Sequence, residues 1–459
     1  MYMEDTIAAV ATAPGEAGIG IVRLSGKNSL EIADKIFRPH IEGKKISENP
    51  RKLLYGKICQ GEKILDEVLL SYMKAPHTFT GEDIVEINCH GGYISVQRIL
   101  ALILKEGARI AEPGEFTKRA FLSGRIDLSQ AEAVIDIIKA KTESGMDIAQ
   151  QQLFGGLSSK VKKSRDIITM SLAKITVAID FPEEDEPEVT YEELAGNISQ
   201  VKEEISALIA SFDNGKILRD GLKTVIVGKP NVGKSSLLNA LLRESRAIVT
   251  DIAGTTRDVI EEYLNIGGIP LKIMDTAGIR QTEDLVEKIG VERSVESMEK
   301  ADLCILMLDA SSPLTEEDVS LLSLMREKRS LVLLNKSDLK PLLTEEEVLA
   351  YLPEKKIIRA SAKEGIGIAE LEEEIRSLVC FGKVSVQNDI MVSNLRHKDA
   401  LQRAQSSCED ALRGLSEGLP LDILETDFRD IWDALGLITG ESVSEDLLDT
   451  IFREFCIGK

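Results

Sequence analysis

The stretch Gly228-Lys229-Pro230-Asn231-Val232-Gly233-Lys234-Ser235 decides the fold of the domain in which it lies. It matches the phosphate-loop pattern G-x-x-x-x-G-K-[ST] in full. The β-branched run at 223–227 predicts a buried parallel strand before it, and the residues from Ser236 onward predict a helix after it. In such a loop, backbone N–H groups surround a triphosphate, the lysine reaches the β and γ oxygens, and the serine hydroxyl ligates Mg²⁺. The stretch therefore predicts a nucleotide-binding α/β domain.

Three later segments follow in the order that a GTPase requires. The strand that ends at Asp275-Thr-Ala-Gly278 offers a carboxylate that holds Mg²⁺ through water, and the Gly278 N–H is placed to sense the γ-phosphate. A second strand leads to Asn335-Lys336-Ser337-Asp338, whose last carboxylate accepts from N1–H and N2–H₂ of guanine. Adenine would leave that carboxylate unpaired, which costs kilocalories and gives specificity. The segment 361–363 resembles the last guanine-contacting loop, so the sequence predicts GTP rather than ATP.

The segment between the phosphate loop and Asp275 determines how hydrolysis is catalysed. Thr256 is predicted as the second Mg²⁺ hydroxyl, while Ile279 stands where Ras-like enzymes place a water-positioning glutamine. Isoleucine cannot orient water, so catalysis must use another residue, a cation or a partner. Downstream candidates, among which the pattern does not choose, are Arg280, Glu283, Asp284 and Glu287. The full set predicted to contact GTP is Asn231, Val232, Gly233, Lys234, Ser235, Ser236, Thr250, Asp251, Ile252, Ala253, Gly254, Thr255, Thr256, Asp275, Thr276, Ala277, Gly278, Asn335, Lys336, Asp338, Ser361, Ala362 and Lys363.

The composition limits the classes of protein that remain. A chain of 459 residues predicts two to four domains, and its formal net charge of −21 argues against broad non-specific binding to nucleic acid or anionic membranes. The six cysteines are scattered without a C-x-x-C pair, which fits a reducing compartment. The first residues lack a basic and apolar leader pattern, and no apolar run reaches about 18 residues. We expect a soluble cytoplasmic protein.

The chain divides by pattern into an α+β domain at 1–120, a helical segment at 121–216, a doubly wound Ras-like α/β GTPase domain at 217–380 and a second helical segment at 381–459. The ends of a compact inserted domain lie close together, so we expect the two helical segments to form one discontinuous bundle. The fold class is therefore multidomain: an α+β domain, a discontinuous helical bundle and an inserted P-loop GTPase domain.

Several local patterns give further expectations. The polar segments 78–83 and 88–92 are each typical of a turn between strands. The basic residues at 160–165 predict a solvated helix face, with RNA contact as the alternative. At the last helix, Ser442 and Glu445 predict a capping box, and the apolar residues from Leu447 to Phe455 fall on one face.

A set of specific motifs is spread along the chain: Asp5-Thr-Ile-Ala-Ala, Gly20-Ile-Val-Arg-Leu-Ser-Gly26, Phe79-Thr-Gly-Glu-Asp, His90-Gly-Gly, Pro113-Gly-Glu-Phe, Asp127-Leu-Ser-Gln-Ala-Glu-Ala, Asp180-Phe-Pro and the ending Cys456-Ile457-Gly458-Lys459. With these motifs, the chain resembles the MnmE (TrmE) family of bacterial tRNA modification GTPases over nearly its whole length. The C-I-G-K ending is the most specific of these, because a helical segment has no generic structural need for it.

The resemblance implies two small-molecule sites. The N-terminal domain would bind a 5-formyltetrahydrofolate or a related one-carbon folate and would form a homodimer; its matching contacts are Arg23, Glu86, Arg125 and Lys459. Arg125 stands where a lysine is common, and its guanidinium suits a folate carboxylate. Cys456 is a candidate nucleophile, although positioning beside the folate pocket is the preferred interpretation. A K⁺ ion in the GTPase site would be held by Asn231, Thr250, Ile252 and Thr255.

The resemblance also implies the reaction. Potassium would supply the charge that an arginine finger supplies elsewhere, Lys234 would hold the phosphates, Glu287 would orient the attacking water, and Arg280 is a further catalytic candidate. With the FAD protein MnmG (GidA), in a heterotetramer or larger complex, the GTPase would add a carboxymethylaminomethyl or aminomethyl group to carbon 5 of the wobble uridine, position 34, of certain tRNAs.

Two other hypotheses remain at this stage. A ribosome-assembly GTPase of the Era or EngA type would carry a KH-like domain with a G-x-x-G loop in a basic setting, and we find none in the sequence. Alternatively, the N-terminal region is an independent folate-dependent transferase that the GTPase regulates. Folate turnover without MnmG would distinguish this hypothesis.

Overall fold

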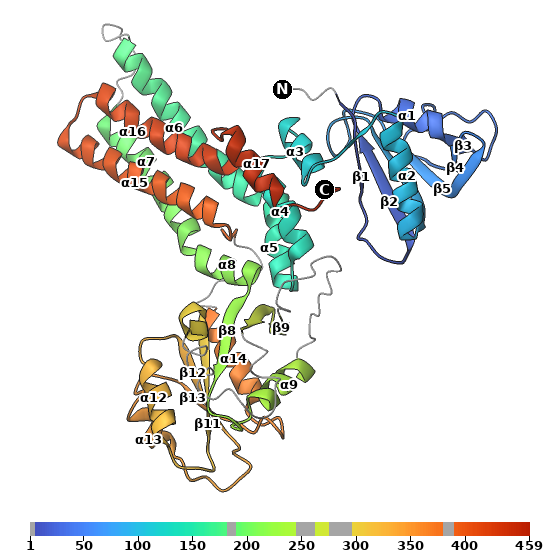
Figure 1. The fold of residues 1–459 in the computed structure, drawn as a ribbon. Helices are drawn as coiled ribbons and strands as arrows, with labels where there is room; N and C mark the ends of the chain where they lie inside the picture. The colour runs from blue at the N-terminus through green and yellow to red at the C-terminus, as the bar shows by residue number, and fades with distance from the viewer. Residues whose placement is uncertain (1–4, 181–189, 245–261, 275–295, 380–389) are drawn as a thin grey trace.

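The computed structural model describes residues 5–180, 190–244, 262–274, 296–379 and 390–459. Along the chain it contains an N-terminal sheet domain, a set of helices, a second sheet domain and a return to the helices (Figure 1). The two helical segments pack into one bundle around the point where the second sheet domain is inserted. The predicted fold class is confirmed. The limits of the individual domains stay predictions.

The N-terminal domain is a seven-stranded sheet with strand order β3-β4-β5-β6-β2-β1-β7, antiparallel except for the parallel pair of β1 and β7. Its strands are β1 (Ile7–Val10), β2 (Ala17–Ser25), β3 (Phe37–Pro39), β4 (Leu53–Gln60), β5 (Lys63–Met73), β6 (Ile84–Gly91) and β7 (Arg109–Ile110). The helices α1 (Ser29–Ile36) and α2 (Tyr93–Lys105) cover one face, because alternate strand residues such as Val22, Leu70 and Ile87 point toward them.

Part of the opposite face of this sheet is uncovered. Leu53, Tyr55 and Leu69 are 62%, 46% and 41% exposed there, and Tyr55 lies directly across from Leu69 in the register.

The expectation that the segment 88–92 forms a turn is wrong. Strand β6 runs through Gly91, so these residues continue a strand. The antiparallel pairing with β2, which includes Ala17 and Gly91, supplies the backbone hydrogen bonds that keep the strand extended.

The bundle is assembled from both helical segments. The first contributes α3 (Glu115–Leu122), α4 (Leu128–Lys139), α5 (Glu143–Leu153), α6 (Gly156–Asp180), α7 (Tyr191–Ala210) and α8 (Phe212–Asp220), and the second contributes α15 (Leu395–Glu417), α16 (Leu421–Thr439) and α17 (Glu445–Arg453). Buried side chains from α6, α7, α15 and α16 form one apolar cluster. Phe428 is fully buried within this cluster. The bundle core therefore needs residues from both sides of the inserted domain.

One local expectation for the helical segments fails at a single residue, and another is wrong. Lys160, Lys162 and Lys163 are exposed as expected. Arg165 instead is 6% exposed, lies 4.0 Å from the centroid of the Trp432 ring and pairs with Glu441. Ser442 does not cap α17, because the hydroxyl of Ser442 bonds to Asp433 instead and the N-cap residue is Ser444. In both cases a contact with α16 or the residues just after it replaces the local role that the pattern predicted.

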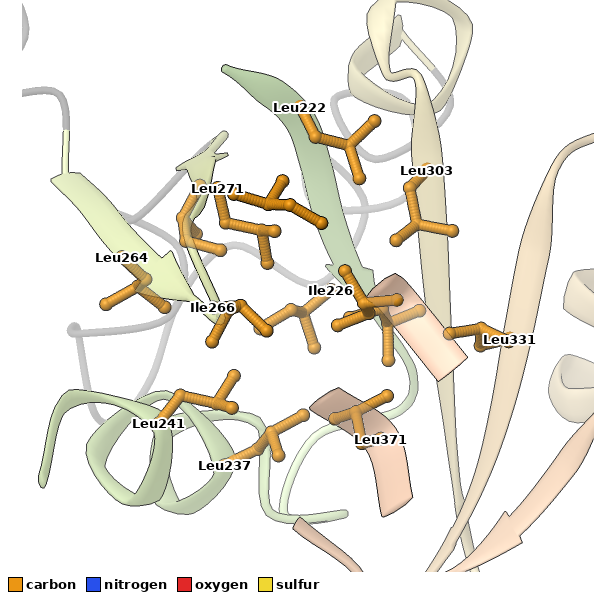
Figure 2. Close-up of a cluster of buried hydrophobic side chains, with 14 of the residues drawn as sticks. Leu222, Ile226, Leu237, Leu241, Leu264, Ile266, Leu271, Leu303, Leu331 and Leu371 are labelled. Carbon is orange, nitrogen blue, oxygen red and sulfur yellow. The ribbon is translucent and has the colours of Figure 1, made fainter. Parts of the chain in front are cut away.

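The inserted domain is a six-stranded sheet with order β13-β12-β11-β8-β10-β9. Its strands are β8 (Leu222–Val227), β9 (Glu262–Ile266), β10 (Ile269–Ile273), β11 (Leu303–Asp309), β12 (Ser330–Asn335) and β13 (Ile357–Arg359), and its helices include α9 (Lys234–Glu244), α12 (Glu316–Leu324), α13 (Glu345–Leu349) and α14 (Ile368–Val379). All pairings are parallel except that of β9 with β10. Leucines and isoleucines from β8, β10, α9 and α14 fill one side (Figure 2), and α12 and α13 cover the other. This two-sided burial explains the continuous apolar runs of the strands.

Candidate functional site

The phosphate loop joins the end of β8 to the start of α9. Gly228 has φ of +150°, and a Cβ there would lie 2.5 Å from the Met307 carbonyl oxygen. A Cβ on Gly233 would lie 2.2 Å from the Asn335 amide nitrogen. Asn231 adopts φ of 63°, a left-handed conformation that asparagine tolerates better than most other residues. The two glycines are therefore required by close approach of the strands behind the loop.

Lys234 holds its side chain within this loop. Its ammonium donates to the carbonyl oxygens of Gly228, at 2.5 Å, and Lys229, at 2.8 Å. Burial lowers the pKa of Lys234, because desolvation opposes the charged form. Ser235 and Ser236 follow in the first turn of α9, where the helix dipole favours an anion. The loop thus combines a confined cation with a helix N-terminus.

The two predicted guanine loops meet the phosphate loop through Asn335. Its amide nitrogen donates to the Val232 carbonyl oxygen at 2.6 Å, and its amide oxygen accepts from the Ala362 N–H at 2.9 Å. Asn335 is 3% exposed, so both bonds are shielded from water. A single side chain therefore joins three segments, with partners 103 positions before it and 27 positions after it in sequence.

The remaining guanine-loop residues are placed around this junction. Lys336 pairs with Asp309 at 2.6 Å in a backbone conformation with φ of 64°. Asp338 is exposed, and a hydrogen bond from the Ser361 hydroxyl lowers its pKa, which keeps it an anionic acceptor. Lys363 is exposed at the same loop. The structure therefore brings every described member of the predicted guanine site to one edge of the sheet.

The remaining predicted GTP and metal residues lie outside the described residues. These are Thr250, Asp251, Ile252, Ala253, Gly254, Thr255, Thr256, Asp275, Thr276, Ala277 and Gly278, together with Ile279 and the catalytic candidates Arg280 and Glu287. Within the described ranges, no group of three or more His, Cys, Asp or Glu side chains is arranged to hold a metal ion.

A second candidate site surrounds Phe116, at the start of α3. Arg23 from β2 pairs with Glu86 from β6 at 2.8 Å, and the Arg23 guanidinium lies 5.7 Å from the Phe116 ring centroid. The same guanidinium lies 3.4 Å from the Gly458 carbonyl oxygen, and the Phe116 N–H donates to the Lys459 carbonyl oxygen at 3.1 Å. Residues from the N-terminal sheet, the first helix of the bundle and the end of the chain thus converge here.

The tail, residues 454–459, is held against the N-terminal sheet by backbone contacts. The Gly114 N–H donates to the Cys456 carbonyl oxygen at 3.3 Å, and Pro113 and Ile457 form an antiparallel bridge. Cys456 itself is exposed. Gly458 has φ of +94°, and a Cβ there would lie 2.2 Å from the Val10 carbonyl oxygen. Only glycine fits this position, which gives the C-I-G-K ending a physical reason.

Arg125 lies near the same cluster. Its guanidinium is 5.0 Å from the Phe79 ring centroid and donates to the Phe79 carbonyl oxygen at 3.1 Å. Phe79 packs against the small apolar cluster that contains Phe116. Arg23, Glu86, Arg125 and Lys459, which were predicted together, therefore lie around one cluster.

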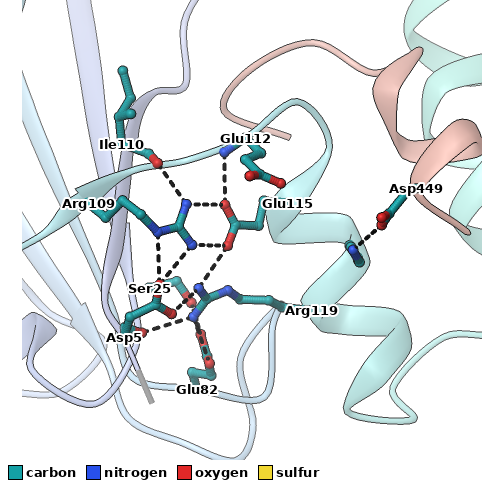
Figure 3. Close-up of polar contacts among 10 residues, drawn as sticks. Asp5, Ser25, Glu82, Arg109, Ile110, Glu112, Glu115, Arg119 and Asp449 are labelled. Carbon is teal, nitrogen blue, oxygen red and sulfur yellow. Dashed lines mark hydrogen bonds and ion pairs between the residues drawn. The ribbon is translucent and has the colours of Figure 1, made fainter. Parts of the chain in front are cut away.

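Sequence reasoning missed the polar network that joins α3 to the N-terminal sheet (Figure 3). Arg119, 4% exposed, pairs with Asp5 at 2.7 Å, Glu115 at 2.9 Å and Glu82 at 3.1 Å. Arg109 bonds to the same Glu115 at 2.6 Å. Buried charges are tolerated when each has several partners, as here. The network holds the helix that carries Phe116.

The segment 78–83 belongs to this network, although the sequence indicated only a turn between strands. It is a loop between β5 and β6, as expected, but Thr80 is fully buried and shares a 2.7 Å hydrogen bond with Ser25. Glu82 accepts from Ser25 at 2.7 Å and from Arg119. In the sequence alone, a Thr-x-Glu pattern in a loop is typical of a turn. A local pattern does not indicate that Glu82 pairs with Arg119, because the two residues are 37 positions apart.

One further property concerns membranes. Within residues 5–180, 190–244, 262–274, 296–379 and 390–459, we find no helix whose length and apolar character would let it span a bilayer.

Comparison with known proteins agrees with this geometry. The family model for the N-terminus of the GTP-binding protein TrmE matches residues 6–125, and the model for the MnmE helical domain matches residues 128–456. The chain is 57% identical to the tRNA modification GTPase MnmE of Clostridioides difficile and 55% identical to that of Alkaliphilus metalliredigens, with 100% of each chain covered. The protein of Acetivibrio thermocellus with the same name is 52% identical at the same coverage. The chain therefore belongs to the MnmE (TrmE) family of tRNA modification GTPases, which confirms the resemblance and the predicted GTP-hydrolysing enzyme.

Proposed function

We propose that this protein is a K⁺-stimulated GTPase that works with an MnmG-type flavoprotein on the wobble uridine of certain tRNAs. The product carries a carboxymethylaminomethyl or aminomethyl group at carbon 5 of uridine 34. GTP hydrolysis drives the conformational change that the modification needs. The observation that carries the proposal is the junction at Asn335, which assembles a guanine site on the same chain as the cluster around Phe116.

The described part of the GTPase site is compatible with the two ions. Ser235 in the first turn of α9 would ligate Mg²⁺, together with Thr256 and, through water, Asp275. Asn231 offers an amide in a left-handed loop position, and it would hold K⁺ with Thr250, Ile252 and Thr255. Bound K⁺ would supply positive charge against the phosphates, and Glu287 would orient the water.

The cluster around Phe116 suits a one-carbon folate. A pteridine is flat and carries amide-like donors and acceptors, and the partly exposed Arg23–Glu86 pair offers one cation and one anion, with Arg23 supported by the fully buried ring of Phe116. Arg125 and Lys459 add cations for the glutamate carboxylates. When bound, the folate would supply the one-carbon unit. Cys456, exposed in the adjoining tail, would lie beside it.

The uncovered face of the N-terminal sheet supports the proposed homodimer. The exposed side chains Leu53, Tyr55 and Leu69 lie on the face that also carries Arg23 and Glu86. Leu53 is in register with Glu86 and Arg23 through Ser71, and Tyr55 and Leu69 lie two residues further along their strands, on the same face. Burying this face between two copies would remove apolar area from water and would place the folate site beside the interface.

The test compares steady-state GTP hydrolysis in KCl and in NaCl at equal ionic strength, with Glu287→Ala alongside. We expect strong potassium stimulation in the unaltered protein and its loss in the variant, while nucleotide binding survives. In parallel, mass spectrometry of tRNA from cells that carry the deletion should show unmodified uridine 34. Equal rates in both salts would refute the K⁺ site, and intact modification would refute the tRNA role.

A further inference from the structure

Helix α4 carries two buried carboxylates one helical turn apart, Glu132 and Asp136. They lie on the same side of the helix, since residues four apart are neighbours on its surface. The chain passes between the bundle and the GTPase domain twice: at the outgoing crossing, from α8 to β8, and at the return crossing, from α14 to α15. Each carboxylate binds a cation close to one of these two crossings. Glu132 binds the start of α15, where the chain returns to the bundle, and Asp136 binds the end of α8, where the chain leaves it.

Glu132 is enclosed by the return crossing. Its carboxylate accepts from Arg396 at 2.6 and 2.8 Å, from His397 Nε2 at 2.7 Å and from Asn394 at 3.1 Å. Burial would raise the pKa of Glu132, but His397 and Arg396 outweigh it and lower that pKa to about 2. Arg396 also donates to the carbonyl oxygens of Leu437 and Ile438 near the end of α16. The carboxylate therefore ties the return crossing to two bundle helices.

Asp136 holds the outgoing crossing. Its carboxylate accepts from Arg219 at 2.8 Å, and Arg219 is two residues before Gly221, which leads directly into β8. Strand β8 ends at the phosphate loop. Burial raises the pKa of Asp136, and Arg219 offsets only part of that effect. Keeping this group charged costs stability, which argues that the pair specifies a position rather than adding stability.

The neighbouring helix α5 and the segment before it contact the GTPase domain as well. Lys141 lies 5.5 Å from the centroid of the Tyr263 ring on β9. A Cβ on Gly268, between β9 and β10, would lie 2.7 Å from the hydroxyl oxygen of Ser144. These contacts reach the hairpin that directly precedes 275–278, the segment predicted to hold Mg²⁺ and to sense the γ-phosphate. The segment 141–144 therefore contacts the GTPase domain at two places, next to the two pairs that α4 forms with α8 and α15.

An adjacent stripe of α4, next to the two carboxylates, packs on the helix that leads to the tail. Leu128 and Ile135 belong to one apolar cluster with Leu448, Phe452 and Phe455. Helix α17 continues into the residues that lie beside Arg23 and Phe116, and Figure 1 shows α4 lying next to α17 near the end of the chain. One helix thus contacts both crossings to the nucleotide domain and the element that carries the tail.

We propose that Glu132 and Asp136 are positioning residues that couple the nucleotide state of the GTPase domain to α17 and the tail. This proposal rests on the proposed function, in which hydrolysis at one site serves chemistry at the other. A movement of β8 pulls on α4 through the single Arg219–Asp136 contact, and a movement of the start of α15 pulls on α4 through the several bonds of Glu132. Helix α4 then shifts α17 through their shared apolar cluster. Coupling of this kind requires a structural element whose position depends on the state of both the nucleotide site and the tail, and α4 is that element.

The experiment uses the full-length protein and measures amide hydrogen exchange with GDP and with a non-hydrolysable GTP analogue. The variants are Glu132→Gln and Asp136→Asn. Glu204→Gln is the matched control, because Glu204 bonds to Lys163 and Ser164 between α6 and α7, away from both crossings. Steady-state GTP hydrolysis and binding of 5-formyltetrahydrofolate are measured on the same samples.

In the unaltered protein and in the control, we expect exchange in α17 and folate affinity to change with the nucleotide. In each α4 variant, that dependence should fall at least several-fold, while nucleotide affinity stays within about twofold. The proposal would be overturned if the α4 variants kept the full dependence of α17 exchange and folate affinity on the nucleotide. It would also be overturned if exchange in α17 of the unaltered protein were the same with both nucleotides. Failure of potassium-stimulated hydrolysis in the unaltered protein would instead count against the proposed function, so the two failures are distinguishable. If one variant misfolds, the other still decides.

Discussion

Replacement of Gly458 by alanine should release the tail from the N-terminal sheet. The new Cβ would lie 2.2 Å from the Val10 carbonyl oxygen, 3.1 Å from the Val10 carbonyl carbon and 3.2 Å from the Ala11 Cα. All three are backbone atoms of a paired strand end, so they cannot move aside cheaply. A non-glycine residue at positive φ costs about 1–2 kcal/mol, and overpacking adds about 1–3 kcal/mol.

A combined cost of about 3 kcal/mol corresponds to a shift of roughly 100-fold in the docking equilibrium. The assay is the rate of hydrogen exchange at the amides of 456–459, together with calorimetric titration of 5-formyltetrahydrofolate. We expect faster exchange and weaker folate binding, whereas the melting temperature of the bundle changes little because the tail is local.

The matched control is Gly418→Ala at the end of α15. Gly418 has φ of +71°, but a Cβ there would meet no atom within 4 Å. It therefore carries the conformational strain without the clash, and tail exchange should stay as in the unaltered protein. Normal tail protection in Gly458→Ala would refute the argument that backbone contact determines the glycine.

Asn335→Ala should weaken GTP binding at least tenfold in a fluorescent-nucleotide titration. The variant loses two buried hydrogen bonds, at about 1 kcal/mol each, and leaves the Val232 carbonyl oxygen without its donor. Unchanged affinity would contradict the role of the junction. Phe428→Ala should destabilise the bundle by about 3–5 kcal/mol in denaturant unfolding, because the ring is fully buried, whereas Phe154→Ala, 81% exposed, should change stability by less than about 0.5 kcal/mol. The His90 hydrogen bond to Asp66 raises the pKa of His90 above 6.5. The contribution of this pair to the stability of the folded protein is therefore complete below pH 6.5 and is lost as pH rises through the raised pKa of His90. NMR titration should show a lower His90 pKa in Asp66→Asn than in the unaltered protein. An unchanged His90 pKa would refute the assignment.

The sequence by itself determined the parts whose chemistry depends on neighbouring residues. The loop at 228–235 needs glycines at set positions and a lysine and serine at the start of a helix, and these requirements are local. The strand and helix periods on either side are also local, so the inserted α/β domain followed from pattern. The Asn335-Lys336-Ser337-Asp338 segment identified guanine for the same reason, because one carboxylate carries the discrimination.

Tertiary structure alone decided which distant side chains meet. Glu132 and Arg396 are 264 positions apart, and Asp136 and Arg219 are 83 positions apart. Arg165 looked solvated from its basic neighbours, yet it is buried because α16 carries Trp432 over it. Ion pairs of this kind depend on how helices pack, and a single sequence records no contact between its distant positions. The periodicity of each helix predicts that it has a buried face, but only packing selects the partner for that face.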